Sequence, residues 1–156
     1  MKRISTHMTR INGKTLYLFT VVFYLILTGS AIAADPVVVI VNAGNPATLL
    51  TISDVKKYYE NDLLRWPDGK KITLYDLKVK DKARREFSNA VLGREPGKIA
   101  MEWANRKITN TAKNPPRTVQ SSTLMQARVG SDSGAIGYLL KSEVTNKKVK
   151  IVTTIK

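Results

Sequence analysis

Residues 37–41 form an uninterrupted run of four valines and one isoleucine. β-branched side chains favour extended backbone. Because the run contains no polar residue, neither face of the strand is suited to contact with water. This pattern is typical of a strand that is buried on both faces of its sheet. The run therefore predicts a sheet that is covered on both sides, as in α/β folds.

The rest of the pattern alternates helices with strands. Further strands are predicted at residues 72–75, at Val119, at residues 134–139 and at residues 149–155. Helices are predicted behind an N-cap at Ser53-Asp54, over residues 82–92, from Pro96 onward, and from a cap at Ser121 or Ser122 through Val129. Gly93 is expected to end the second helix, and the third is expected to turn Ile99, Ala100, Trp103 and Ala104 inward.

This alternation predicts an α/β fold, a small single-domain three-layer sandwich. The sequence shows no internal repeat, linker or low-complexity segment. A hydrophobic content of 43% and a charged content of 24% are ordinary for a globular chain and argue against extensive disorder.

Residues 1–34 have the features of a cleaved signal peptide. Residues 1–15 carry four basic residues and no acid, residues 16–27 are apolar, and Ala31-Ile32-Ala33 supplies an A-x-A cleavage site. A membrane span requires about 20 apolar residues, so this run is short for an uncleaved anchor. We expect cleavage near Ala33 or Ala34 and a periplasmic or secreted protein over residues 35–156. Translation from Met1 and from Met8 both remain open.

The 122 residues that remain contain neither histidine nor cysteine, because the only histidine, His7, precedes the cleavage site. This excludes Ser-His-Asp and Cys-His catalysis and zinc sites that use those ligands. The carboxylates show no paired spacing that is typical of acid–base catalysis. The sequence therefore predicts a non-enzyme without a cofactor or a resident metal.

Removing four basic residues leaves 22 Lys and Arg against 12 Asp and Glu, a net charge of +10. The basic residues are dispersed and no nucleic-acid-binding motif accompanies them, so no nucleic-acid partner is expected. Residues 78–85 are the exception, with five basic residues and one acid in eight positions. This electropositive helix start makes Lys82, Arg84 and Arg85 candidate anion ligands, although a solvated helix face explains the same charges.

Two further segments are candidates for the same site. Ser121, Ser122 and Thr123 precede a helix, where hydroxyls and amides can meet an anion or simply cap the helix. Asn42 follows the first strand, at the end where open α/β sheets bind ligands, but it is equally suited to a turn.

Four segments in a fixed order carry a family resemblance: residues 39–46, 50–55, 66–72 and 133–138. Between them, residues 87–93 and 102–116 add two similar helical segments. Together they resemble the phosphate-binding proteins of bacterial phosphate ABC importers, which have the type 2 periplasmic binding protein fold. The resemblance covers nearly all of residues 35–156 and corresponds to one lobe, the second, of a two-lobed protein.

The resemblance implies a non-catalytic protein that binds phosphate or a similar anion and works with an ABC importer or another envelope protein. A single lobe supplies half of a cleft, which a homodimer would complete. Where the family has a Ser/Gly/Thr-rich turn, this chain has Asp81, Lys82 and Ala83. The alternative is therefore a cell-envelope protein–protein adaptor that kept the fold and lost the ligand.

Overall fold

A computed structural model describes residues 35–61 and 63–155. The predicted signal peptide and its cleavage site near Ala33 or Ala34 lie outside the described residues. Within the described ranges, no helix is long and apolar enough to span a bilayer.

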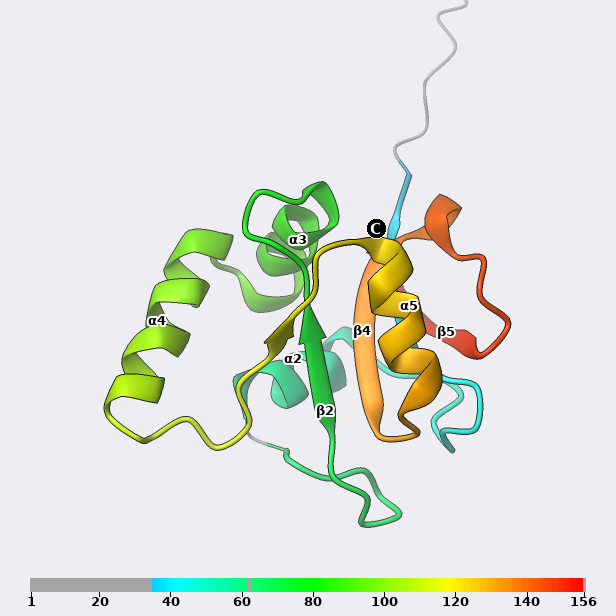
Figure 1. Ribbon diagram of the computed structural model, residues 1–156, viewed down its shortest axis with the longest axis horizontal. Coiled ribbons are helices and arrows are strands. Elements are labelled where there is room, and N and C mark those ends of the chain that lie inside the picture. The colour runs from blue at the N-terminus through cyan, green and yellow to red at the C-terminus, as the bar shows by residue number, and fades with distance from the viewer. Residues whose placement is uncertain (1–34, 62, 156) are drawn as a thin grey trace, which may run out of the picture. The chain divides into compact units, whose positions relative to one another are not determined.

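Strands and helices alternate along the chain (Figure 1). Their bounds are β1 Val37–Asn42, α2 Ile52–Glu60, β2 Thr73–Asp76, α3 Lys82–Phe87, the π-helical turn η1 Ser88–Leu92, α4 Pro96–Ile108, β3 Arg117–Thr118, α5 Ser122–Ser131, β4 Ala135–Leu140, the 3-10 turn η2 Lys141–Glu143 and β5 Val149–Ile155. The five strands form one mixed sheet in the order β3-β2-β4-β1-β5. β2 runs parallel to β3 and β4, whereas β1 runs antiparallel to β4 and β5.

Helices cover both faces of this sheet. Successive strand residues point to opposite faces, and Gly137 and Tyr138 on β4 show what each face meets. Gly137 lies against Met125 and Val129 of α5, whereas the Tyr138 ring stacks on Phe87 of α3 with centroids 3.8 Å apart. β1, which lies between β4 and β5, is buried from Val37 to Val41. The predicted α/β three-layer sandwich is thereby confirmed, and the β-branched run is buried on both faces as expected.

The first helix begins two residues earlier than predicted. Its N-cap is Thr51, not Ser53, because Thr51 and Asp54 form a capping box. The Thr51 hydroxyl accepts a hydrogen bond from the Asp54 amide at 3.1 Å, and the Asp54 carboxylate accepts one from the Thr51 amide at 3.0 Å. This reciprocal pair requires the cap and the acid to be three residues apart, a spacing that Ser53 does not have.

Replacing Thr51 with Val is expected to lower the free energy of unfolding by about 1 kcal/mol at pH 7. The Thr51 hydroxyl and amide hold the pKa of Asp54 below its ordinary value of 3.8. This contribution is therefore present above pH 3.8 and is lost as the pH falls through the lower pKa of the folded state. Urea unfolding at pH 7 and pH 3 measures the difference, and Ser53→Ala is the control. An equal loss in both variants would contradict the assignment of the cap.

Three other sequence predictions need correction. Residues 82–92 form α3 followed by the π-helical turn η1, although Gly93 ends the segment with a left-handed φ of 66° as expected. The second strand begins at Thr73 and the third at Arg117, each displaced by one or two residues.

In α4 only Ile99 of the four predicted inward residues is buried, since this helix packs mainly against η1. Trp103 is half-buried and lies beneath the Arg106 guanidinium, 5.2 Å from its ring centre, and Ala104 is exposed.

Two glycines in the last third of the chain allow close packing. A Cβ on Gly134 would overlap the backbone carbonyl of Lys71, whereas one on Gly137 would overlap the flexible side chain of Met125. We expect Gly134→Ala to lower the free energy of unfolding by about 2–3 kcal/mol and Gly137→Ala by less, because overpacking costs more where the neighbour cannot move. Gly97→Ala is the control, since no atom lies near its added methyl group. Denaturant unfolding gives the ranking, and a larger loss at Gly137 would contradict it.

Candidate functional site

The sheet places the candidate residues at two opposite edges. β2, β3 and β4 are parallel, so their carboxyl ends meet at one edge, from which the chain leads into α3 and α5 (Figure 1). We call this the carboxyl edge. The structure thus brings the α3 candidates to the same edge as the α5 candidates. Asn42 lies at the opposite edge, because β1 runs antiparallel to β4.

At that opposite edge the Asn42 side chain is engaged within the protein. Its amide donates to the carbonyls of Val129 at 3.1 Å and Gly130 at 2.9 Å, near the end of α5. Its carbonyl oxygen accepts from the Gly44 amide at 2.9 Å. These bonds join the end of β1 to the end of α5, so Asn42 has a structural role here.

Arg84 points into the core rather than toward solvent. Its side chain pairs with the Asp76 carboxylate and donates to the Tyr138 hydroxyl at 3.2 Å, and that hydroxyl donates to Asp76. Arg84 is only 2% exposed, and Asp76 is also buried. Neighbouring helical residues point about 100° apart, so Arg84 shares the buried face with Phe87 while Arg85 faces solvent. Arg84 precedes the apolar Phe87 by three positions, which places both on one face of a helix. This spacing could have predicted from the sequence that Arg84 is buried and that Arg85 is exposed.

Aromatic rings surround this buried ion pair. The Phe87 ring packs against both tyrosines, with its centre 3.8 Å from that of Tyr138 and 4.8 Å from that of Tyr59. The Tyr59 hydroxyl donates to the Tyr75 carbonyl at 2.7 Å. Burial raises the pKa of both Tyr59 and Tyr138, so both hydroxyls remain protonated donors at neutral pH.

Asp81 occupies the start of α3. Its carboxylate accepts hydrogen bonds from the amides of Ala83 at 2.8 Å and Arg84 at 3.4 Å. Those amides are the donors that a bound anion would otherwise use at a helix start. The side chain thus places a fixed negative charge at the position where an anion would have to bind by amide contacts.

The exposed charge at the carboxyl edge comes from side chains. Lys78, Lys80, Lys82 and Arg85 are all exposed, and Lys82 makes one long contact of 3.9 Å with Glu86. At the start of α5, Ser121 is the N-cap and accepts from the Leu124 amide at 3.2 Å. Ser122 donates to Glu143 at 3.0 Å, and Thr123 is exposed. Lys82, Arg85, Ser121 and Thr123 are therefore the predicted site residues that are exposed at this edge.

Within the described ranges, no group of three or more His, Cys, Asp or Glu side chains is arranged to hold a metal ion.

Comparisons with solved structures match this architecture. An ABC-type phosphate transport receptor from Vibrio cholerae superposes with a TM-score of 0.60 at 19% identity, over 76% of this chain and 46% of the receptor. A putative phosphate ABC transporter substrate-binding protein with bound phosphate from Clostridium perfringens gives 0.60 at 18% identity, over 76% and 44%. PstS from Borrelia burgdorferi gives 0.58 at 15% identity, over 76% and 47%.

The chain has the fold of one lobe of a phosphate-binding receptor. It spans less than half the length of each of these proteins. No protein-family model matches the sequence, and no curated protein matches it. The expected resemblance is therefore confirmed at the level of the fold.

The buried ion pair gives a prediction that separates Arg84 from Arg85. Arg84→Met is expected to lower the free energy of unfolding by about 3–5 kcal/mol, because Asp76 would remain buried without its counter-charge. Arg85→Met removes the same charge from an exposed position and is expected to change stability by less than about 0.5 kcal/mol. Adding Asp76→Asn to Arg84→Met should recover part of the loss. Denaturant unfolding of the four proteins measures this, and equal losses for both arginines would contradict the burial of Arg84.

Proposed function

We propose that this chain is an exported, non-catalytic binding protein that holds phosphate or a similar anion at the carboxyl edge. The observation that supports it best is the exposed cationic cluster of Lys78, Lys80, Lys82 and Arg85 at that edge. The likeness of the fold to phosphate receptors, one of them with bound phosphate, supports the same class of ligand. Export would follow cleavage near Ala33 or Ala34, and an ABC importer is the proposed partner.

Side chains, not backbone amides, would hold the anion. Arg85 can make a two-pronged contact, and Lys82 can neutralise charge if it leaves Glu86. Thr123 adds an exposed hydroxyl at the start of α5. Such contacts lie in water, where charge interactions are weak and sensitive to salt. Tight binding would require a second wall, from a partner protein or from a second copy of the chain.

A second function, a cell-envelope protein–protein adaptor, is favoured by one observation. The Asp81 carboxylate already accepts hydrogen bonds from two backbone amides at the start of α3, which are then not free to bind an anion. A chain that has lost its ligand would keep the lobe fold and use its surface for a partner protein.

Calorimetric titration with phosphate and with sulfate, at low and at physiological salt, tests the first proposal. We expect saturable phosphate binding that weakens at least about tenfold, or 1.4 kcal/mol, in the variant Lys82→Ala/Arg85→Ala. The matched control is Lys147→Ala/Lys148→Ala, which removes the same charge from exposed residues beside Val149, at the edge of Asn42. Equal weakening in both variants would indicate only a general effect of net charge.

An additional variant, Asp81→Ser, separates the two functions. It replaces the carboxylate with a neutral cap and removes a repulsive charge from the edge. If an anion binds there, this variant should bind phosphate more tightly than the parent protein. Absence of heat for the parent and for Asp81→Ser, with both anions, would overturn anion binding and leave the adaptor.

A further inference from the structure

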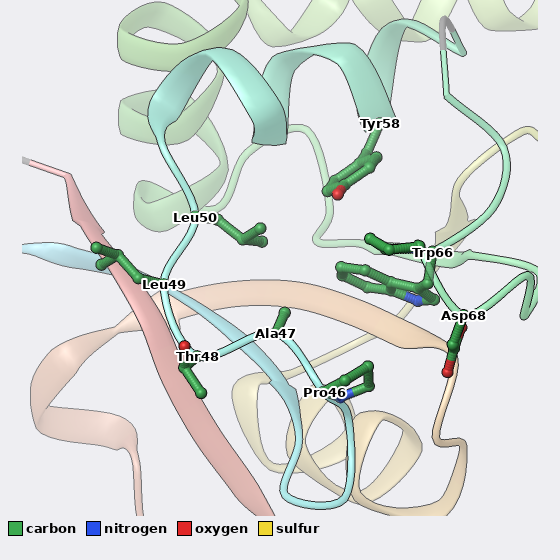
Figure 2. A pocket seen from close by; sticks show the side chains of 9 residues that line it. Pro46, Ala47, Thr48, Leu49, Leu50, Tyr58, Trp66 and Asp68 are labelled. Atoms are coloured by element: carbon green, nitrogen blue, oxygen red, sulfur yellow. The ribbon is translucent and has the colours of Figure 1, made fainter.

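A second candidate site lies at the edge of the sheet opposite the basic cluster. A cavity of about 570 Å³ opens between the chain that leaves β1 and the turn that leads into β2 (Figure 2). Pro46, Ala47 and Leu50 line one side, and Tyr58, Trp66 and Asp68 line the other. We call this the aromatic pocket. Its volume is in the range of small-molecule sites, which are mostly apolar with a few polar groups.

The aromatic wall of this pocket is held in place by the core. The Trp66 indole nitrogen donates to the Gly134 carbonyl at 2.9 Å, and the Trp66 carbonyl accepts from the Gly69 amide at 2.9 Å. The Tyr58 and Trp66 rings are 5.0 Å apart and inclined at 58°. A wall that is fixed in this way requires little ordering when a ligand binds, which favours affinity.

The Tyr58 hydroxyl is one of the polar groups in the lining of the pocket, with Thr48 and Asp68. Tyr58 is 5% exposed, and Figure 2 shows its oxygen pointing into the space between Leu50 and Trp66. No hydrogen bond joins this hydroxyl to any residue of the described part of the chain. Burial raises the pKa of Tyr58, so the hydroxyl stays protonated at neutral pH. The Tyr58 side chain is thus held in the core while its hydroxyl is available to a ligand that enters the pocket.

The charge of the pocket differs from that of the rest of the protein. Asp68 is the only charged residue in its lining, and none of the lysines and arginines line it. Lys70 lies outside the lining and approaches Asp68 at 3.9 Å, in an exposed pair of the kind that contributes little. The other Asp68 oxygen accepts from the Lys70 amide at 3.0 Å, which fixes the carboxylate near the pocket. A negative ligand is therefore disfavoured here, and a positive one is favoured.

We propose that the aromatic pocket binds a small aromatic amine. The ring of the ligand would pack against Leu50, Pro46 and Trp66, and its ammonium group would lie by the Asp68 carboxylate. The Tyr58 hydroxyl would pair with a polar atom or with the π-face of the ring. This site is separate from the anion site in place, in charge and in the ligand that it selects.

Three probes with the same ring and different charges test the proposal: tryptamine, indole and indole-3-propionate. Binding is followed by the indole N–H signal of Trp66 in a proton–nitrogen correlation spectrum of the whole protein. Trp103 on α4 provides the second indole signal and serves as an internal control. We expect saturable shifts at Trp66 alone, with tryptamine binding at least tenfold more tightly than indole-3-propionate. Equal affinity, the reverse order, or similar shifts at Trp103 would overturn the proposal.

Two variants identify the groups responsible. Asp68→Asn keeps an oxygen for the Lys70 amide and removes the charge, so it should abolish the preference for tryptamine while indole still binds. Ala47→Leu should fill the pocket and weaken all three probes, with an unchanged Trp103 signal as evidence that the protein folds. A preference for tryptamine that survives in Asp68→Asn would contradict the role of the carboxylate. Phosphate should not displace tryptamine, so this result does not depend on whether the carboxyl edge binds an anion.

Discussion

The buried pair of Arg84 and Asp76 is the interaction on which the arrangement of this protein depends. It connects α3 to the end of β2, and the Tyr138 hydroxyl extends the connection to β4. A charge in the core is tolerated only when its partner and its hydrogen bonds are supplied by the same fold. The pair also fixes the rotation of α3, which directs Phe87 onto Tyr138 and leaves Lys82 and Arg85 in solvent.

This arrangement gives the sheet two edges with different chemistry. The carboxyl edge has exposed lysines and an arginine, and the Asp81 carboxylate accepts the hydrogen bonds of two backbone amides at the start of α3. The opposite edge has an apolar hollow with one carboxylate and no basic residue in its lining. Both follow from the strand directions, because β1 runs antiparallel to β2 and β4 and its exit loop therefore meets the entry turn of β2. A single lobe thus has two surfaces of different chemistry at opposite ends of its strands.

Local signals predicted several elements correctly. The strand at Val37, the end of a helix at Gly93, the helix start at Pro96 and the cap at Ser121 each depend on the nearby residues alone. The errors have equally local physical reasons. Ser53 is a good cap residue, but Thr51 is better placed to exchange hydrogen bonds with Asp54. Trp103 has the spacing of a core residue, yet it is only half-buried, and Arg106 of its own helix lies over its ring.

The sequence by itself determined the class of the fold, the absence of histidine and cysteine chemistry after residue 34, and the position of the basic cluster. Those properties depend on residue types and short spacings. Only the tertiary structure decided that Arg84 is buried while Arg85 is exposed, and that Asn42 lies at the edge opposite the basic cluster. The aromatic pocket could not be predicted from the sequence either. Leu50, Tyr58 and Trp66 come together through strand directions and packing between separate segments, and no local sequence pattern indicates this.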